Sequence, residues 1–564
     1  MYIKNFFWQK LLFKCLFVKF CNMKEIFKEY KYLILLWIFC IIGLFFFCGH
    51  YSNILIDFGR EVYYPEQILE GKVLYKDLFN IYGPLSYQFN AVLYKLFGMK
   101  LSTLYFSGWF CSILAVSGIY LIAQKFLSKF LSFCIGFFTI SVCVATTCIF
   151  NFHFPYSWAV LYGLIAFLYS LYFLLKFNDD KKCLNLCLSS LLAGICIANK
   201  YDFLFYAFVV LFFIFKEKNW KAFLCFISIP LISCGILFIQ GMKISNLITT
   251  LQTIKIMAGT KTLTYFYQNG GIYFHPKALL TDIQLFCKVG IPFGIILYGA
   301  YLYERNKSVS IVLSIAGYFL YLWFFTINIG STLGFLPIFL LILFLVCLKK
   351  INKNLVILCL SALAASVKVF WVMLLYLYGN YYVSIVLIAI LALIFNFIPK
   401  KLEKVSGVYL LIASACFLFA NFYMLSIADN RIQTDKGVIY TEKTISNSSN
   451  EFIEFINKET KPDDRIVIFP EGMTINFLTD RKSDDYYNSL IPLYIETFGE
   501  EEVIKHFKSD LPEYIVFNNQ SMKDYYLQYI CSDYALDFCS FIKENYYQRK
   551  LIDKGFRYLI FKRK

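Results

Sequence analysis

The segment IDFGREVYYPEQILEGKVLYKDLFNIYGPL, residues 56–85, follows the first apolar run of the chain and is rich in acids. Fourteen acidic residues precede position 428, and five of them lie in this segment: Asp57, Glu61, Glu66, Glu70 and Asp77. An ionised carboxylate at the edge of a bilayer is costly unless it is solvated, paired or used. Asp57 stands close to the point where the apolar run ends, so we predict that it is the catalytic residue.

The composition around this segment predicts a polytopic α-helical membrane protein. Hydrophobic residues make up 59% of the chain and charged residues 16%, and the mean hydropathy is +0.61. Apolar runs long enough to cross hydrocarbon as helices recur over the first three quarters of the sequence, which excludes a soluble globular protein. We expect about thirteen transmembrane helices, at 32–49, 101–124, 130–150, 155–175, 184–198, 203–215, 222–240, 287–303, 308–326, 332–348, 354–377, 381–398 and 407–427.

The connections between these runs alternate between lysine-rich and lysine-poor. Basic residues remain on the cytoplasmic side, so the N-terminus is expected inside and the C-terminus outside. The net charge of +17 is explained by these connections and by the N-terminal segment, and it does not indicate nucleic-acid binding. Only eight of 54 basic residues are Arg, and Phe, Ile, Tyr and Asn abound, a bias that AT-rich codon usage also produces. From this bias we infer a bacterial source, in which the expected location is the plasma membrane.

Three parts of the chain are expected from this pattern. They are a basic cytoplasmic N-terminus (1–31), a transmembrane domain (32–427) with outward loops at 50–100 and 241–286, and an extracytoplasmic C-terminal domain (428–564). The last part is predicted to be an α/β domain, with NEFIEFINKE and EEEVIKHF as helices and RIVIF, PEYIVF and RYLIFK as strands. Cys531 and Cys539 are candidates for a disulfide there, which the sequence leaves open.

The first outward loop carries helical spacing beyond Asp57. Three residues suited to substrate binding follow it: Arg60, Glu61 and Tyr64. At this spacing Glu61 and Tyr64 share a helix face with Asp57. Residues 86–98 are apolar but too short to span, so we expect an interfacial or re-entrant helix there.

Three further charged residues are candidates for substrate contact: Lys200, Asp202 and Lys368. The spans that flank Lys200 are short, so the tip between them stays close to the hydrocarbon and its charges must face a cavity or each other. A structural pair of Lys200 with Asp202 fits the sequence as well as substrate contact does. Lys368 lies within the predicted span 354–377, where it either snorkels or binds a lipid phosphate.

The predicted cytoplasmic connections are too short for a nucleotide-binding domain, and the sequence has neither GxxxxGK[ST] nor a GxGxxG after a strand. This argues against an ATP-driven pump and against an enzyme that uses cytosolic nucleotide sugars. We therefore expect any chemistry in the outward segments. The loop 241–286 is long enough to form a lid over a site, and a packed connection is the alternative.

The pattern I-D-x-G-R-E-x-x-x-P-x-x-x-L-x-G-x-x-L-Y-x-D, from Ile56 to Asp77, is followed by Y-G-P-L and an apolar half-helix. It resembles the opening of bacterial membrane glycosyltransferases of the GT-C superfamily. The nearest comparison is glycosyltransferase family 39, which is similar to protein O-mannosyltransferases and lipid A aminoarabinose transferases. The resemblance covers about the first 220 residues, and SVKVF, YGNYY and the C-terminal domain resemble the same group more loosely. A WWD-type motif is missing, which argues against transfer of a whole oligosaccharide.

The resemblance implies that Asp57 is the catalytic base. Nucleotide sugars are not found outside the cytoplasm, so the expected donor is a sugar on a polyprenyl phosphate, attacked with inversion by an acceptor hydroxyl. The sequence shows no clustered metal ligands, and we expect neither a metal nor a cofactor. The expected partners are the polyprenyl-phosphate-linked sugar, a glycan, lipid or protein acceptor, and the lipid bilayer.

Other classes fit parts of the sequence. A secondary transporter explains the spans and buried charges, but it predicts repeat symmetry that is not evident here. A polysaccharide polymerase or ligase of another membrane family would place key arginines and a histidine in large outer loops, where this chain has few. A non-enzymatic scaffold leaves the acid-rich first loop without a role.

Overall fold

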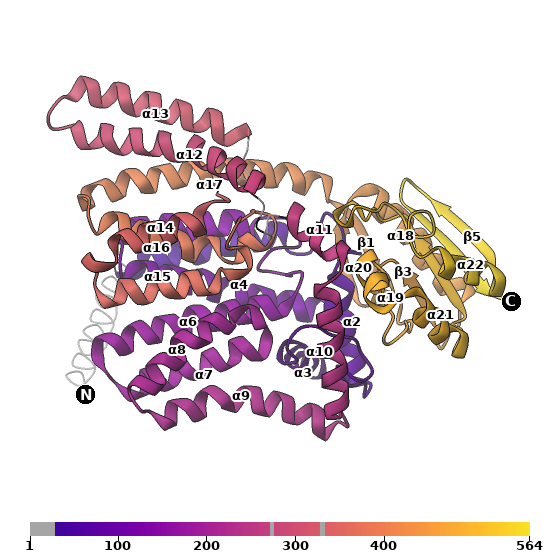
Figure 1. Cartoon of the computed structure of the whole chain (residues 1–564). Coiled ribbons are helices and arrows are strands. Elements are labelled where there is room, and N and C mark those ends of the chain that lie inside the picture. The colour runs from indigo at the N-terminus through magenta and orange to yellow at the C-terminus, as the bar shows by residue number, and fades with distance from the viewer. Residues whose placement is uncertain (1–28, 271–273, 275, 328–332) are drawn as a thin grey trace, which may run out of the picture.

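The computed structural model describes residues 29–270, 274, 276–327 and 333–564. Most of the predicted basic N-terminus, residues 1–28, lies outside these ranges. The described chain consists of a large helical bundle and a smaller C-terminal part with a β-sheet, which lies at one end of the bundle (Figure 1).

Apolar helices dominate the bundle. Among the described residues, seven helices are long and apolar enough to cross a membrane: Glu29–Phe47, α4 (Leu101–Gln124), α6 (Trp158–Asp180), α9 (Trp220–Ile239), α12 (Pro276–Leu302), α13 (Lys307–Ile327) and α17 (Glu403–Ile427). Shorter apolar helices lie between them: α5 (Lys129–Thr139), α7 (Cys183–Asn199), α8 (Leu204–Lys216), α14 (Leu336–Cys347), α15 (Lys353–Ala365) and α16 (Val383–Phe395). Each predicted span thus contains a helix, while the count of thirteen crossings stays a prediction.

The two predicted spans 130–150 and 354–377 are helical over only part of their length. The span expected at 354–377 stops as a helix at Ala365, so the prediction that Lys368 lies inside a long helix is wrong. The following segment turns back on itself, because Gly379 lies where a Cβ would come within 2.3 Å of the Leu374 carbonyl oxygen. Asn380 then donates to the Phe150 carbonyl at 2.7 Å. Irregular backbone of this kind is tolerated at membrane depth where protein groups satisfy it.

The first loop predicted to face outward forms two helices, α2 (Phe58–Leu69) and α3 (Leu85–Phe97). Both helix predictions for this loop are confirmed. A two-stranded hairpin, β1 (Asn430–Thr434) and β2 (Gly437–Thr441), pairs with the entry to the loop, since Tyr51 N donates to the Tyr440 carbonyl at 2.9 Å and Tyr440 N to the Gly49 carbonyl at 2.7 Å. The end of the bundle is therefore joined to the C-terminal part by backbone pairing.

The described part of the second loop predicted to face outward is also helical, with α10 (Ile244–Ala258) and α11 (Lys261–Asn269). The first turn of α11 is held by Glu496 of α20 (Pro492–Phe498), which accepts from Lys261 N at 2.8 Å and from Thr262 N at 3.0 Å. A carboxylate at a helix N-terminus is favourable because it satisfies free N–H groups and opposes the helix dipole. This loop is therefore tied to the C-terminal part.

The C-terminal part contains an α/β arrangement, as predicted. In the described chain a four-stranded sheet has the order β3 (Ile466–Phe469), β4 (Tyr514–Asn518), β6 (Arg557–Arg563) and β5 (Tyr546–Asp553). The pair β3–β4 is parallel and the other pairs are antiparallel. Five α-helices of the described chain accompany it: α18 (Lys443–Glu459), α19 (Met473–Thr479), α20, α21 (Glu500–Ser509) and α22 (Leu536–Asn545). The sequence did not predict β5, a polar edge strand, or the short helices α19, α20 and α22.

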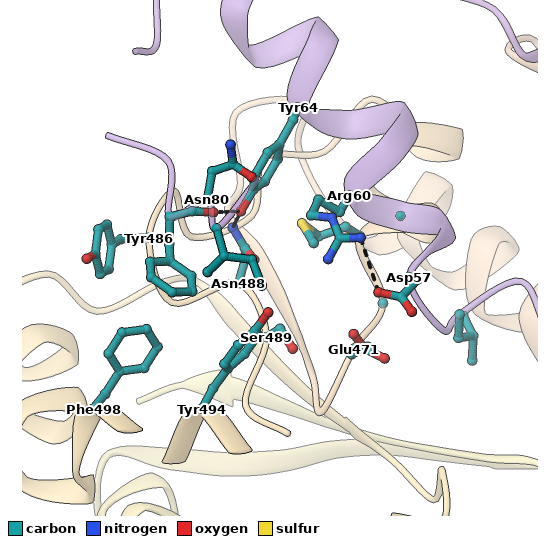
Figure 2. A pocket seen from close by; sticks show the side chains of 16 residues that line it. Asp57, Arg60, Tyr64, Asn80, Glu471, Tyr486, Asn488, Ser489, Tyr494 and Phe498 are labelled. Carbon is teal, nitrogen blue, oxygen red and sulfur yellow. Dashed lines mark hydrogen bonds and ion pairs between the residues drawn. The ribbon is translucent and has the colours of Figure 1, made fainter. Parts of the chain in front are cut away.

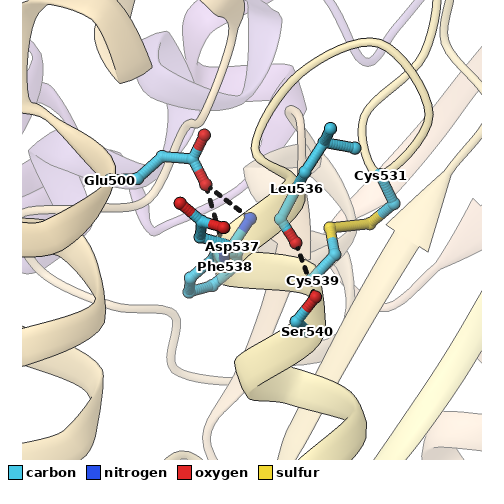
Figure 3. Close-up of a disulfide and its surroundings, with 7 residues drawn as sticks. All are labelled: Glu500, Cys531, Leu536, Asp537, Phe538, Cys539 and Ser540. Atoms are coloured by element: carbon cyan, nitrogen blue, oxygen red, sulfur yellow. Dashed lines mark hydrogen bonds between the residues drawn. A yellow bond between two sulfur atoms is a disulfide. The ribbon is translucent and has the colours of Figure 1, made fainter.

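A disulfide joins Cys531 to Cys539 at the start of α22 (Figure 3). Beside it, the Glu500 carboxylate accepts from the backbone N–H groups of Asp537 at 2.9 Å and Phe538 at 3.0 Å. The sequence had left this disulfide open. Disulfides persist in oxidising compartments, so the bond agrees with the predicted extracytoplasmic place of this part.

Candidate functional site

Asp57 lies at the start of α2 with φ of 56°, in the left-handed region that few residues other than glycine adopt. Within the described chain its side chain makes no capping hydrogen bond to the helix. The carboxylate instead lines a pocket between α2 and the C-terminal part, and 29% of the side chain is exposed (Figure 2). A strained residue that exposes a carboxylate to a pocket is a marker of a functional position.

Arg60 lies between two carboxylates. Its Nη2 is 3.2 Å from Asp57 Oδ1 and its Nε is 3.0 Å from Glu61 Oε1. Nη2 also donates to the Tyr156 carbonyl at 3.1 Å. Because three acceptors hold the guanidinium, Arg60 fixes the position of the Asp57 carboxylate.

Glu61 is fully buried, and neighbouring groups donate hydrogen bonds to both of its carboxylate oxygens. Besides Arg60, it accepts from the Tyr87 hydroxyl at 2.9 Å and from the Trp158 backbone N–H at 2.8 Å. Burial raises the pKa of Glu61, and these partners oppose that effect. Glu61 does not line the pocket, so it joins α2 to α3 and to the start of α6 behind Asp57.

Tyr64 lines the pocket one turn further along α2. Its hydroxyl donates to the Phe79 carbonyl at 2.8 Å and accepts from Asn488 Nδ2 at 3.1 Å (Figure 2). Tyr64 therefore links the first loop to the C-terminal part across the pocket. Of the first-loop residues predicted to bind substrate, Arg60 and Tyr64 share the pocket with Asp57.

Glu471 is the site residue that sequence reasoning missed. It lies in the loop after β3, and Figure 2 shows its carboxylate facing that of Asp57. Burial, followed by the charge of Asp57, raises the pKa of Glu471 to about 8. Asn518 Nδ2 donates a hydrogen bond to the Glu471 backbone carbonyl at 2.8 Å. The available signal was Pro470-Glu471-Gly472 directly after a buried strand, because sites often lie at the carboxyl ends of parallel strands.

Lys200, Asp202 and Lys368 form a second cluster on the bundle side. Asp202 Oδ2 is 3.5 Å from Lys200 Nζ and 3.6 Å from Lys368 Nζ, and all three side chains are largely buried. Lys200 also donates to the Tyr156 hydroxyl at 2.5 Å. The predicted pair of Lys200 with Asp202 is confirmed, and the structure adds Lys368 to it.

Tyr82 connects the two clusters. Its ring centroid lies 5.0 Å from Arg60 Cζ and 4.5 Å from Lys200 Nζ. The close approach of the first loop to the end of α7 depends on Gly83, because a Cβ at this position would come within 2.1 Å of the Ala198 carbonyl oxygen. The Y-G-P-L motif thus brings the first loop onto the tip that carries Lys200. Cations are attracted to the face of an aromatic ring, and here Arg60 and Lys200 share the ring of Tyr82.

The charge of this region is positive on the bundle side and negative at the pocket. Two lysines surround one aspartate in the buried cluster, whereas Arg60 meets the carboxylates of Asp57 and Glu61. Among the described residues no group of three or more His, Cys, Asp or Glu side chains is placed to hold a metal ion. The arrangement is able to bind an anionic group beside Tyr82 and to accept a proton at Asp57.

No protein-family model matches the sequence, and no curated protein matches it. Among solved structures, the chain is similar to ArnT from Cupriavidus metallidurans bound to undecaprenyl phosphate, with 11% identity over 94% of this chain and 98% of that chain and a TM-score of 0.44. It is also similar to the archaeal oligosaccharyltransferase AglB from Archaeoglobus fulgidus in complex with an inhibitory peptide and a dolichol-phosphate, with 12% identity over 88% of this chain and 70% of that chain and a TM-score of 0.42.

Proposed function

We propose that this protein is an integral-membrane glycosyltransferase that moves a hexose or pentose from a polyprenyl-phosphate donor to an extracytoplasmic acceptor. The observation that carries the proposal is the position of Asp57. A partly exposed carboxylate in a strained backbone conformation is held by Arg60, and Tyr82 separates it from the buried lysines of the second cluster. This supports a proton acceptor next to an anion site.

The proposed reaction is a single displacement. The acceptor oxygen attacks the anomeric carbon from the face opposite the phosphate, and the bond between that carbon and the phosphate oxygen breaks as the new glycosidic bond forms. The acceptor proton passes to Asp57, and the phosphate leaves with the bonding electrons. Inversion at the anomeric carbon follows, and an acidic leaving group such as a phosphate requires no general acid.

Arg60, Lys200 and Lys368 are the proposed phosphate-binding residues. Lys200 and Lys368 are kept in place by Asp202, and Arg60 and Lys200 contact the same tyrosine ring. Fixed cations in a poorly hydrated site stabilise charge that develops on a leaving group. Glu61 and Tyr64 position Arg60 and the wall of the pocket.

The proposed orientation has thirteen crossings in a bacterial plasma membrane, with the N-terminus inside. It is supported by the arrangement in Figure 1, where the connections between α6 and α7 and between α12 and α13 lie at the end of the bundle away from the C-terminal part. These are two of the lysine- and arginine-containing connections predicted to face the cytoplasm.

The test is a transfer assay with purified protein in lipid and a radiolabelled pool of polyprenyl-phosphate sugars. Asp57→Asn keeps the size of the side chain but removes the proton acceptor, so we expect transfer to fall at least about a hundredfold. The matched control is Asp77→Asn, because Asp77 belongs to the same loop but accepts a hydrogen bond from Val73 N at 2.9 Å outside the pocket. Undiminished transfer by Asp57→Asn would remove this residue from the mechanism.

A further inference from the structure

The turn that follows β3, residues 470–474, packs on the start of α2. The Thr474 hydroxyl donates to the Ile54 carbonyl at 2.5 Å, and a Cβ on Gly59 would come within 2.6 Å of the Thr474 backbone nitrogen. The pocket between this turn and α2 has a free volume of about 20 Å³, which is room for about one water molecule. The turn therefore lies directly against the helix and leaves no space for a substrate between them.

Glu471 is the residue of this turn that meets Asp57. Both residues line the same small pocket, and their carboxylates face each other in Figure 2. The backbone N–H of Asp57 also interacts with the Glu471 carboxylate, and this contact lowers the pKa of Glu471. Glu471 thus faces Asp57 at its backbone as well as at its side chain.

Asp57 needs such support because its backbone is strained. A φ of 56° is unfavourable for a residue with a side chain, and it persists only where the surrounding structure fixes it. From within α2, Arg60 Nη2 holds Asp57 Oδ1 at 3.2 Å. Glu471 supplies a contact from the opposite side, because it belongs to the C-terminal part.

Glu471 is itself held by the sheet. Asn518 Nδ2 donates to the Glu471 backbone carbonyl at 2.8 Å, and Gln520 Nε2 donates to Glu471 Oε2 at 3.4 Å. Asn518 ends β4 and Gln520 follows it, and β4 pairs with β3 directly before the turn. The pairing of these two strands therefore sets the position of the Glu471 carboxyl group relative to α2.

The surroundings of Glu471 favour its protonated form. Among the described residues, the charged groups that face it are Asp57 and Arg60, and burial followed by the charge of Asp57 raises the pKa of Glu471 to about 8. The other titratable groups near it are tyrosines whose raised pKa keeps them neutral: Tyr494, Tyr525 and Tyr534. A protonated carboxyl has one O–H to donate and a carbonyl oxygen that accepts, so at neutral pH Glu471 is able to bond to both groups of Asp57.

Building on the proposed function, we propose that Glu471 is a positioning residue that holds Asp57 from the C-terminal side. Its O–H donates to the Asp57 carboxylate and its carbonyl oxygen accepts from the Asp57 N–H, so that the base keeps the orientation in which it meets the acceptor hydroxyl. Glu471 itself contacts neither substrate. The C-terminal part thereby takes part in catalysis, although the base and the phosphate-binding residues all precede it in the chain.

Steady-state kinetics distinguish positioning from substrate binding. The radiolabelled polyprenyl-phosphate sugars are varied at a fixed amount of acceptor, which is a membrane extract of the source organism with the gene deleted. We expect Glu471→Ala to lower kcat at least about tenfold and to leave the KM of the donor within about twofold, because alignment of the base acts only in the transition state. Glu471→Gln, which keeps a donor and an acceptor of the same size, recovers most of this loss. Glu454→Gln on the exposed face of α18 is the matched control, with unchanged kcat and KM.

The pH profile gives a second readout, which a purely structural role would not change. Ionisation of Glu471 removes its O–H and places two negative carboxylates face to face, so kcat of wild type should fall as the pH rises through about 8. Glu471→Gln has no proton to lose and should lack this fall. The same fall in wild type and in Glu471→Gln would contradict the role of Glu471.

Infrared difference spectroscopy tests the contact without the reaction. The carbonyl band of protonated Glu471, identified by its loss in Glu471→Gln, should disappear in wild type as the pH rises through about 8. In Asp57→Asn it should disappear at a lower pH, because the charge of Asp57 helps to raise the pKa of Glu471. An unshifted titration in Asp57→Asn would overturn the proposal, as would a wild-type kcat of Glu471→Ala. A shifted titration in a protein that transfers no sugar would refute the proposed reaction and support the contact between the two carboxyl groups.

Discussion

Asp57 and Glu61 show how the environment divides roles between two carboxylates on one helix. Glu61 is fully buried, and its carboxylate accepts hydrogen bonds from Arg60, Tyr87 and Trp158. The fold therefore supplies the donors that this carboxylate needs. Among the residues that the structure describes, Asp57 has a single ion pair, with Arg60, and its side chain is partly exposed at the pocket. An acid that is partly free can change its protonation during a reaction, and one that is enclosed holds its neighbours in place.

Lys368 is the residue whose role is most directly testable. It contacts Asp202 and lies 3.9 Å from the ring centroid of Tyr378, and 16% of its side chain is exposed. If the proposed function holds, Lys368→Met should weaken binding of a polyprenyl phosphate roughly thirtyfold, because one charge-assisted contact worth about 2 kcal/mol is lost. Binding is measured by equilibrium titration with the radiolabelled lipid. Lys350→Met, beyond the end of α14, is the control, and unchanged affinity of Lys368→Met would show that Lys368 only supports the fold.

At the scale of elements, the loop before α20 is held by a charged pair in the C-terminal part. Asp484 is buried, accepts from the backbone N–H groups of Tyr486 and Tyr487, and lies 2.7 Å from His506 Nε2. This bond raises the pKa of His506 above its usual value. Burial alone raises the pKa of Asp484, but His506 and the two N–H groups outweigh it and the net pKa is lowered.

The stability of this part should therefore depend on pH. The folded state holds the His506 proton more tightly than the unfolded chain, so the pair stabilises fully below the ordinary histidine pKa, about 6.5, and its contribution is lost as the pH rises through the raised value. We expect the melting temperature of wild type to fall across this interval, and that of His506→Gln to fall less. At the acid end, the contribution of Asp484 is lost as the pH falls through its lowered pKa. Parallel melting curves for both proteins would contradict the pairing.

Helix α2 and the C-terminal part meet at Gly59. A Cβ at this position would come within 2.6 Å of the Thr474 backbone nitrogen, which is closer than real Cβ contacts allow. We expect Gly59→Ala to shift α19 away from α2 and to lower transfer at least about tenfold, because the reacting groups lose their alignment. The transfer assay measures the loss. Gly235→Ala on α9 has open space around it and should leave the rate unchanged, and full activity of Gly59→Ala would show that the contact is not required.

At the scale of the whole molecule, local patterns were predictable from the sequence and long-range pairs were not. The helix after Asp57 and the pairing of Lys200 with Asp202 follow from residues that are neighbours in sequence, where spacing and hydropathy decide. The meeting of Lys368 with Asp202, and of Glu471 with Asp57, depends on how distant segments fold back. Lys368 was misplaced because an apolar run does not show where a helix ends and an irregular segment begins.

The orientation of the molecule gives a prediction of its own. A reporter that is active only outside the cytoplasm should work when inserted after Asp435, in the turn between β1 and β2. It should fail at Lys181, after α6, and at Lys350, after α14. The reason is the retention of basic connections in the cytoplasm. Activity at both kinds of position would contradict the thirteen-crossing arrangement and the outward position of the first loop.

The ion pairs of Lys436 have a consequence for the making of this protein. Lys436 bridges Glu66 of α2 and Asp480 after α19, at 2.6 Å and 2.7 Å, and so fastens a segment made early in translation to one made near its end. During synthesis Asp57 leaves the ribosome long before Glu471 does. A growing or prematurely terminated chain thus carries Asp57 without the C-terminal part that covers it, and the complete pocket forms only after the last quarter of the polypeptide has been made and folded.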